Sequence, residues 1–428
     1  MQSLKITEEF QEALTLLEEG KEHLFITGKA GTGKSTLLQY FRNHTKKQIV
    51  VLAPTGVAAL NVKGQTIHSF FQFPSTTPQA IKMKKRPLSF RKLLKKIDAI
   101  VIDEISMVRA DMLDLIDKTL RHNLGNDSPF GGIRMVFFGD LYQLPPVVRY
   151  EEKNLLEAFY RSPYFFEAHA LHHTELQIIE LQTIYRQTEG EYIALLNGIR
   201  GNSITAEEIE QLNSRYEPDY EEAVESNAIY LMTTNAGADA LNRKKLEELT
   251  SWPHTYTGTT TGNFMPSQAP AAQELELKVG AQVMMTSNDS QKRWVNGSLG
   301  HITEIQEEEG SDTILVALSN GKEVEVSQYT WEVTHYTLDA KEQPTSEVVG
   351  SFTQYPLRLA WAVTIHKSQG KTFDEVIVDI GRGTFAHGQL YVALSRCTSF
   401  EGMVLKKPVQ KKHIWTDEHI QTFMERKS

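Results

Sequence analysis

The sequence is almost without cysteine. Cys397 is the single thiol in 428 residues, so no internal disulfide can form, and no cysteine or histidine cluster has the ligand spacing of a zinc site. Stability must therefore come from packed cores, and this cysteine usage suits a reducing compartment. At this length the chain should divide into two or more domains, each able to bury an apolar core.

Long apolar runs are missing as well. No stretch approaches the roughly 20 consecutive apolar residues that a membrane-spanning helix needs. From Met1 the chain enters a polar helical pattern at once, without the apolar segment of a secretory signal. We therefore expect no membrane partner and a cytoplasmic protein.

An excess of positive charge is the third absence. Lysine and arginine number 45 against 54 acidic residues, which gives a formal charge of -9. Because these cations dominate phosphate binding, the balance argues against wholesale coating of a nucleic acid. A narrow channel with few cations, helped by polar side chains and backbone amides, is still compatible with it. The one dense basic run extends from Lys82 to Lys96, and a solvated helix face explains its last four cations, from Arg91 on, as well as a DNA contact does.

What the sequence does have is a repeated order of short apolar run, turn and helical pattern, which indicates the α/β class with parallel sheets covered by helices. A helix is predicted over residues 8–19, with Thr7 as its N-cap and Gly20 after its last turn. Six runs are apolar throughout, as expected of strands buried on both faces. These runs are 24–26, 49–52, 99–102, 135–138, 229–232 and 376–378.

Between residues 251 and 356 polar and apolar residues alternate instead. The runs 313–317 and 323–326 flank Asn320-Gly321, which is a strong hairpin signal. The α/β pattern resumes at Leu357. We therefore predict a small β insertion within an α/β domain.

Residues 28–35 match the pattern G-x-x-x-x-G-K-[ST] in full, between a predicted strand and a predicted helix. The glycines let backbone N–H groups turn inward around phosphates, and the helix N-terminus favours their charge. Lys34 is expected to reach the β and γ phosphates and Ser35 to ligate Mg²⁺, so ATP and Mg²⁺ are the predicted cofactors. The ATP-binding residues predicted here are Gly28, Ala30, Gly31, Thr32, Gly33, Lys34, Ser35 and Thr36.

Two acidic residues follow the apolar run 99–102. Asp103 is expected to hold Mg²⁺ together with Ser35, and Glu104 to orient or deprotonate the attacking water. The same pair could also cap the helical pattern that follows, and both roles can hold together. Gln143 follows the run 135–138 and is a candidate sensor of the γ phosphate, although its segment alone would pass for a polar turn.

Further blocks follow in a fixed order along nearly the whole chain. With the phosphate loop they resemble the petite-integration-frequency (PIF) type DNA helicases of superfamily one, in the branch that runs 5′ to 3′ and in its compact bacterial form. The blocks are Ala-Pro-Thr-Gly-Val-Ala-Ala at 53–59, Gly-Gln-Thr-Ile-His-Ser-Phe at 64–70, Asp-Glu-Ile-Ser-Met at 103–107, Tyr-Arg-Gln at 185–187, Val-Asn-Gly-Ser-Leu-Gly at 295–300, Thr-Ile-His-Lys-Ser-Gln-Gly at 364–370 and Leu-Tyr-Val-Ala-Leu-Ser-Arg at 390–396.

This resemblance implies a fold of two RecA-like P-loop NTPase lobes, residues 1–175 with the phosphate loop and residues 176–428. It implies a small wedge insertion at 64–96 in the first lobe, and it makes the β insertion at 251–356 a barrel of the Src-homology-three type. ATP would lie between the lobes and DNA across their tops. The family's signature helix would run from Glu104 to Arg121.

The resemblance also implies residue roles. Arg186 and Arg396 match two arginine fingers, which would stabilise charge on the transferring phosphoryl group. Gly370 belongs to the block that reports on ATP, and Gln11 is the candidate adenine reader, one residue from Phe10, which aligns more directly. The implied DNA-binding residues are Pro54, Thr55, Gly56, Thr66, His68, Ser69, Thr234, Asn235, Thr364, His366, Lys367 and Ser368.

Two aromatic residues of the second block have a competing interpretation. Phe70 could stack on a base, but clustered aromatics such as Phe70 and Phe71 more commonly pack in a core, and we predict packing for both.

The leading hypothesis is an ATP-dependent helicase that translocates 5′ to 3′ on single-stranded DNA and unwinds partial duplex or structured DNA. It would act in replication, repair, recombination and genome or telomere maintenance, as a monomer in the cytoplasm of a bacterium, at the nucleoid. One alternative is a RecD-like motor that needs a larger complex, and another is a DNA-binding switch that ATP clamps without unwinding. An intact Glu104 and the pair of arginines favour turnover.

Overall fold

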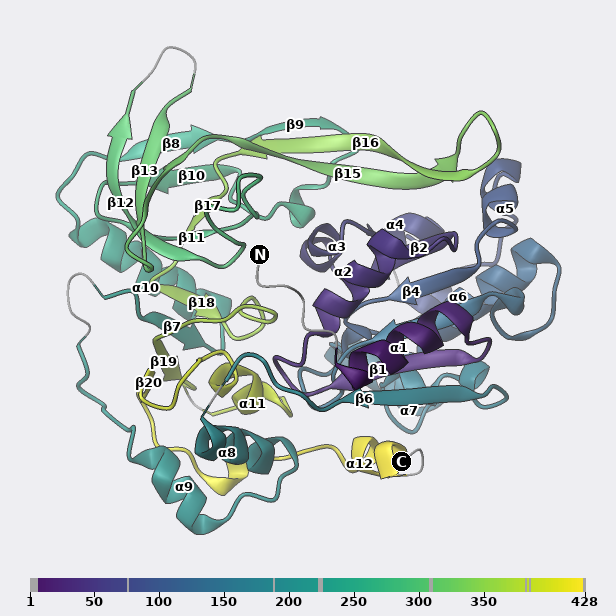
Figure 1. The fold of residues 1–428 in the computed structure, drawn as a ribbon, viewed down its shortest axis with the longest axis horizontal. Coiled ribbons are helices and arrows are strands. Elements are labelled where there is room, and N and C mark those ends of the chain that lie inside the picture. Colours follow the sequence, from purple (N-terminus) through teal and green to yellow (C-terminus); the bar gives the residue numbers. More distant parts are fainter. Residues whose placement is uncertain are drawn as a thin grey trace. The chain divides into compact units, whose positions relative to one another are not determined.

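The computed structural model describes residues 7–74, 77–187, 189–221, 226–307, 311–381, 383–384 and 386–425 (Figure 1). The chain divides into two compact units, one of Met1–Tyr185, Val333–Val349 and Asp417–Ser428, the other of Arg186–Glu332 and Gly350–Thr416. The sequence placed the boundary between residues 175 and 176, ahead of the point found.

The first unit is built on a six-stranded sheet in the order β3-β2-β4-β5-β1-β6, in which every neighbouring pair is parallel (Figure 1). The boundary lies later than predicted because β6 pairs with β1 along its whole length. The predicted runs 24–26, 49–52, 99–102 and 135–138 are confirmed as strands. The strands are β1 (His23–Gly28), β2 (Ile49–Ala53), β3 (Gln65–Thr66), β4 (Ala99–Ile102), β5 (Arg134–Phe138) and β6 (Leu176–Leu181).

Apolar side chains fill both faces of this sheet, because successive residues of a strand point to opposite sides. Leu24 and Ile26 pack into the core under α1 and α2, whereas Phe25 packs into the core under α6. The helices of the unit are α1 (Glu8–Glu19), α2 (Lys34–His44), α3 (Gly56–Asn61), α4 (Ile67–Phe71), α5 (Leu88–Leu94), α6 (Ala110–Leu124), α7 (Tyr150–Glu157) and α12 (Glu418–Glu425), with single turns η1 (Pro78–Ala80), η2 (Ile105–Met107), η3 (Pro129–Gly132), η4 (Phe165–Glu167) and η5 (His169–Leu171).

Two helix predictions have different outcomes. Helix α1 has the predicted bounds, and the Thr7 side chain accepts a hydrogen bond from the Phe10 N–H as its cap. The predicted helix from Glu104 is wrong at its start. Glu104 has a left-handed backbone with φ of 51°, the turn η2 follows, and α6 begins only at Ala110.

The second unit has a four-stranded parallel sheet in the order β18-β7-β19-β20 (Figure 1). Its strands are β7 (Ile229–Met232), β18 (Ala362–Thr364), β19 (Val376–Asp379) and β20 (Met403–Leu405), which confirms the predicted runs 229–232 and 376–378. The helices are α8 (Gly190–Arg200), α9 (Ala206–Asn213), α10 (Asn235–Glu248), α11 (Gln389–Leu394) and the turn η7 (Lys411–His413).

An antiparallel region separates β7 from β18 along the chain. The predicted hairpin is confirmed, since β13 and β14 pair through Ile314 and Val326 around the turn at Gly321. A five-stranded sheet, β14-β13-β12-β11-β17, has its own core, while the two-stranded sheet is β10-β8 and the three-stranded one β15-β16-β9. The elements are β8 (His254–Thr257), β9 (Thr259–Gly262), η6 (Pro266–Gln268), β10 (Glu274–Leu277), β11 (Gln282–Met285), β12 (Leu299–Gln306), β13 (Thr313–Leu318), β14 (Glu323–Val326), β15 (Tyr329–Leu338), β16 (Pro344–Gln354) and β17 (Leu357–Leu359).

Part of the β15/β16 hairpin, Val333–Val349, belongs to the first unit. Tyr336 anchors it, because its hydroxyl accepts a hydrogen bond from the Val51 N–H at 3.0 Å and its own N–H donates to Gln65 Oε1 at 3.3 Å. Among the helices formed by the described residues, none is long and apolar enough to cross a bilayer.

Candidate nucleotide and DNA sites

The predicted nucleotide residues of the first unit meet at one edge of its sheet. Strands β4, β5 and β1 are consecutive neighbours, and all run in the same direction. Their carboxyl ends therefore lie side by side, and this is the edge at which open parallel sheets bind ligands. The phosphate loop follows β1, the two acids follow β4 and Gln143 follows β5.

The phosphate loop requires its glycines. Gly28, Gly31 and Gly33 all have positive φ, of 151°, 84° and 84°. A Cβ on Gly28 would lie 2.6 Å from the Leu181 carbonyl oxygen, so a larger residue would displace the strand beside it. Thr32 is buried and donates its hydroxyl to the Lys29 carbonyl oxygen at 2.9 Å, which closes the loop on itself.

Lys34 lies across this loop. Its Nζ donates to the carbonyl oxygens of Gly28 at 2.7 Å and Lys29 at 2.9 Å. Helix α2 begins at Lys34, so Ser35 and Thr36 stand exposed in its first turn. A cation, a helix N-terminus and two hydroxyls in this arrangement suit a chain of phosphates.

The two acids differ in their surroundings. Asp103 is buried, and this burial together with the neighbouring Glu104 charge raises the pKa of Asp103 to about 7, while Lys34 lowers it. Carboxylate and hydroxyl oxygens are ligands that Mg²⁺ accepts, and a divalent cation at Asp103 would offset the repulsion between the acids. Ser35 and Asp103 therefore fit the predicted metal.

Gln143 is held by Asp140, a residue for which we predicted no role. Its side-chain amide donates to Asp140 Oδ2 at 3.2 Å, and its N–H donates to the Asp140 carbonyl oxygen at 3.0 Å. Both side chains are buried at the end of β5. Asp140 therefore fixes where the Gln143 amide points.

Of the two candidate adenine readers, Phe10 and Gln11, only Gln11 is accessible to a base. Phe10 packs into the core with Leu17 and Leu37 and is not available to a base, whereas Gln11 is exposed on α1. Tyr185 is a further candidate residue of the nucleotide site, to which the sequence analysis assigned no role. Its N–H donates to the Gly31 carbonyl oxygen at 2.9 Å, its half-exposed ring lies beside Gly33, and an aromatic residue directly before a predicted finger was the available signal.

The two predicted finger arginines meet in the second unit around Ser395. Arg186 donates an η nitrogen to the Ser395 carbonyl oxygen at 3.1 Å, and Gln187 donates its side-chain amide to the same oxygen. Arg396 donates Nη2 to Ser395 Oγ at 2.8 Å and Nε to the Val392 carbonyl oxygen at 2.9 Å. Arg396 is only 1 % exposed, so its orientation is set by these acceptors.

In the first unit the two segments predicted to contact DNA, which follow β2 and β3, lie next to each other. Strands β2 and β3 are parallel neighbours, with Ala53 opposite Thr66, so Pro54–Gly56 and the segment from Thr66 leave the sheet together. The Thr55 side chain caps α3 and the Thr66 side chain caps α4. His68 is half buried, and this burial lowers its pKa.

Ser69 has a partner that the sequence did not indicate. Its Oγ lies 2.9 Å from His335 Nε2 on β15 and accepts a hydrogen bond from Gln65 Nε2 at 3.0 Å. Phe70 and Phe71 are buried, which confirms packing over stacking.

The DNA blocks of the second unit are neighbours in the same way. Strand β18 pairs with β7, with Thr364 opposite Met232, so the segment after Thr364 leaves the sheet beside Thr234 and Asn235, which are exposed. Lys367 is exposed too, although part of its side chain is covered. This partial burial, and then the nearby Arg358 charge, lower the pKa of Lys367.

The other residues of this block have mixed positions. Ser368 is fully buried, with its hydroxyl donated to the Ile365 carbonyl oxygen at 2.8 Å. We correct its predicted DNA contact to a role in shaping the turn. Thr364 is buried, and burial lowers the pKa of the half-buried His366. Gly370 is exposed, with a φ of 78°.

Comparison with known proteins gives consistent matches. Residues 5–204 match the family described as PIF1-like helicase, residues 263–305 match the DNA helicase Pif1 2B domain, and residues 359–399 match the UvrD-like helicase C-terminal domain. The ATP-dependent DNA helicase Pif1 of Bdellovibrio bacteriovorus is 31% identical over 411 residues, which are 94% of this chain and 88% of that protein.

Solved structures of Pif1 from Bacteroides sp. are similar along the whole chain. The complex with ADP-AlF4 has 40% identity and a TM-score of 0.91, over 98% of this chain and 96% of that one. The form bound to ssDNA has the same identity and coverage with a TM-score of 0.70.

Proposed function

The chain belongs to the PIF1-like helicase family and is an ATP-dependent DNA helicase, and from this premise we propose that it moves 5′ to 3′ along single-stranded DNA and unwinds the duplex ahead of it. The observation that carries the proposal is the paired arrangement of strand ends. Each unit has two neighbouring strands that end in predicted DNA-contacting blocks, and the first unit also joins the phosphate loop to Asp103 and Glu104.

For hydrolysis we assign the phosphates to the loop amides and Lys34. Ser35 and Asp103 would hold Mg²⁺, which supplies charge neutralisation at the phosphates. Glu104 orients the attacking water and accepts its proton, and Gln143, held by Asp140, senses the γ phosphate.

The arginines complete this assignment. Arg186 and Arg396 supply positive charge to the transferring phosphoryl group, the step at which such arginines act. Their shared anchor at Ser395 supports this role, because it would move them as one group.

The DNA contacts are proposed to be few and independent of sequence. Thr55, Thr234 and Asn235 offer exposed hydroxyl and amide groups, and Lys367 offers one exposed cation. Such contacts suit the DNA backbone and agree with the formal charge of -9.

Two insertions are assigned within this function. Residues 64–96 are proposed as the wedge, supported by a cavity of about 190 Å³ whose wall includes Lys85, Arg91, Lys92 and Lys95. The antiparallel region with the five-stranded sheet is proposed as a barrel of the Src-homology-three type, supported by its separate core.

The oligomeric state and the cellular location of the protein are also proposals. One chain carries all the predicted blocks, which supports a monomer. We propose that it works in replication, repair and recombination at a bacterial nucleoid. Sedimentation at working concentration tests the monomer directly.

The experiment that tests the direction uses two partial duplexes, one with a 5′ single-stranded tail and one with a 3′ tail. Each is incubated with ATP and Mg²⁺, with Lys34→Ala as the control that cannot hydrolyse ATP. We expect unwinding of the 5′-tailed duplex only, lost in the control while binding of single-stranded DNA persists.

Unwinding of the 3′-tailed duplex would reverse the proposed direction. DNA-stimulated ATP hydrolysis without unwinding of either duplex would instead favour a motor that needs a partner or a clamp that does not unwind.

A further inference from the structure

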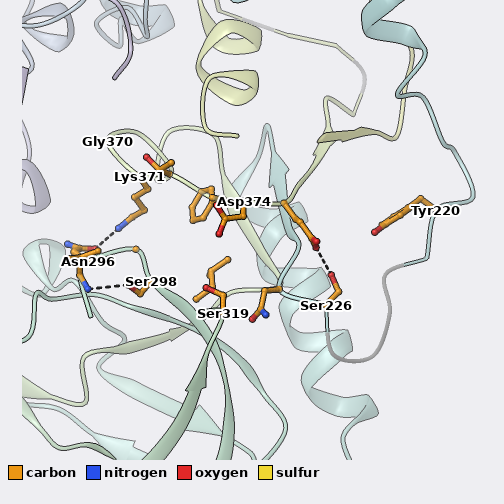
Figure 2. Close-up of a pocket in the computed structure, with 15 residues that line it drawn as sticks. Tyr220, Ser226, Asn296, Ser298, Ser319, Gly370, Lys371 and Asp374 are labelled. Carbon is orange, nitrogen blue, oxygen red and sulfur yellow. Dashed lines mark hydrogen bonds between the residues drawn. The ribbon is translucent and has the colours of Figure 1, made fainter. Parts of the chain in front are cut away.

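A cavity of about 740 Å³ lies within the second unit, and its lining includes Gly370, the last residue of the block 364–370 (Figure 2). Its wall is formed by the loop before β12, the segment before β19 and the segment before β7. Of the 15 residues drawn in Figure 2, Lys371 is the one cation. It directly follows Gly370, and no role in the proposed mechanism involves it.

Lys371 is tied to the loop before β12. Its Nζ donates to Asn296 Oδ1 at 2.5 Å, the dashed line that joins these two labelled residues in Figure 2. Gly297, with a φ of 100°, lies along the aliphatic part of the lysine, because a Cβ there would stand 3.3 Å from Lys371 Cγ. The loop therefore grips the side chain along its length.

That loop is itself fixed to the β insertion. The Asn296 N–H donates to Asn288 Oδ1 at 2.8 Å, and the Gly297 N–H donates to the Met285 carbonyl oxygen at 2.8 Å, at the end of β11. Asn296 is thus a firm anchor for the lysine.

The other end of Lys371 reaches the arginines. Its carbonyl oxygen accepts a hydrogen bond from Arg396 Nη1 at 3.2 Å. Arg396 and Arg186 then share Ser395, as described above. A continuous series of hydrogen bonds therefore leads from the β insertion to both predicted fingers.

We propose that Lys371 is a positioning residue for ATP hydrolysis, anchored by Asn296 so that its backbone carbonyl orients Arg396. The inference rests on the proposed role of Arg396. A guanidinium acts through the fixed directions of its N–H groups, and small displacements of a catalytic group lower rates strongly.

The charge of the lysine is part of this arrangement. Burial and the nearby Arg358 charge lower the pKa of Lys371 to about 8. Asp374 and Glu375 are the acids that line the same cavity. The bond to Asn296 is therefore assisted by charge below this pKa and weakens above it.

The test compares Lys371→Met, Lys371→Arg, Asn296→Ala and Asn296→Asp with the wild type. Lys322→Met is the matched control, since Lys322 is exposed on the β13/β14 turn. Steady-state ATP hydrolysis is measured at saturating single-stranded DNA, together with the Kd for that DNA and the melting temperature.

We expect Lys371→Met and Asn296→Ala each to lower kcat roughly tenfold, with KM for ATP and the DNA Kd nearly unchanged. Lys371→Arg and Asn296→Asp should retain most activity, because a charged donor or acceptor is kept. The double variant, which combines Lys371→Met with Asn296→Ala, should be no slower than either single variant, because both substitutions break the same hydrogen bond. In wild type, kcat should fall above the lysine pKa, and in Lys371→Arg it should not.

An unchanged kcat in Lys371→Met, an equal loss in Lys371→Arg, or additive losses in the double variant would overturn the proposal. Arg396→Ala separates this result from the proposed function. If that variant keeps wild-type turnover, the finger assignment itself is wrong.

Discussion

At the scale of single residues, Glu104 has the most telling backbone. It is a non-glycine residue in the left-handed region, with φ of 51°, two residues after the end of the buried strand β4. Such conformations cost about 1 to 3 kcal/mol and persist where the surrounding structure imposes them, often at active sites. The Glu104 charge still raises the pKa of Asp103, so the two adjacent acids interact although only Glu104 has this backbone.

Replacing the charge of Glu104 without changing its shape tests its proposed role in activating water. Glu104→Gln should bind ATP as the wild type does but hydrolyse it about 10² to 10⁴ times more slowly, because the amide cannot accept a proton. Single-turnover hydrolysis and binding of a fluorescent ATP analogue measure the two steps. Near-normal turnover would remove the water-activating role from Glu104.

A partly buried histidine, His23, is expected to make the first unit sensitive to acid. His23 Nδ1 accepts a hydrogen bond from the Met135 N–H at 3.0 Å, and burial, followed by the Arg134 charge, lowers the pKa of His23 to about 4. In the unfolded state the histidine binds a proton near its ordinary pKa of 6.5, so this contribution to stability is complete above that pH and is lost as the pH falls toward 4.

The loss should be on the order of 3 kcal/mol across this window. His23→Asn keeps an acceptor for the Met135 N–H but cannot titrate there. Urea unfolding at several pH values should therefore give a flatter profile for the variant. Identical slopes for both proteins would show that another group causes the acid sensitivity.

Several residues show why part of the candidate site could be predicted from local sequence and the rest could not. The phosphate loop and the strands before it were predictable, because turn chemistry and apolar runs are local signals. The burial of Arg396 and Ser368 was not, because it depends on segments distant in sequence that pack around them. The same holds for the bond between Ser69 and His335, which are 266 residues apart.

At the scale of elements, α6 is organised by three buried acids, Asp111, Asp114 and Asp117, at spacings that place them on one face. Asp114 accepts hydrogen bonds from the N–H groups of His169 and Ala170, at 3.1 Å and 2.9 Å, and so caps the turn η5. These contacts explain why the Asp114 carboxylate is buried on a helix that packs against an apolar core.

Removing one of these caps should destabilise the fold without touching the chemistry. Asp114→Ala leaves two N–H groups and the Tyr160 hydroxyl without their acceptor, and we expect a loss of about 2 to 4 kcal/mol in unfolding free energy. Lys118→Ala, exposed on the same helix, is the control and should change stability by less than about 0.5 kcal/mol. Chemical unfolding checks both, and equal losses would contradict the capping role.

Helix bounds show the same division between local and distant causes. Helix α1 was predicted to the residue, since its cap, its apolar spacing and Gly20 are all contained in it. The start of α6 was not, because Glu104 has a left-handed backbone and the turn η2 intervenes before Ala110, and helix propensity reveals neither. The unit boundary moved for a similar reason, since a strand partner cannot be read from one segment.

At the scale of the whole molecule, the first unit is assembled from three separate stretches of chain. The third contributes α12, whose Ile420 is fully buried in the core with Phe165 and whose Phe423 ring stacks on Phe166 with centroids 4.2 Å apart. This helix is therefore part of the core of the unit that carries the phosphate loop.

A cavity made there should weaken that unit selectively. Ile420→Ala should lower its unfolding free energy by about 2 to 4 kcal/mol. Calorimetry with and without a non-hydrolysable ATP analogue identifies the transition, because the analogue raises the melting temperature of the unit that binds it. A change confined to a transition that the analogue does not move would contradict this assignment.

The three-part assembly also bears on how the protein is made. Domains usually fold in the order in which the ribosome releases them. Here the core beneath Phe165 and Phe166 stays incomplete until residues 417–425 have been synthesised, after most of the second unit has emerged. The nascent chain therefore presents an open apolar surface for much of translation, and closing it demands contacts distant in sequence, which slow folding. We expect the first unit to mature last and to be the part of the molecule that most needs chaperones.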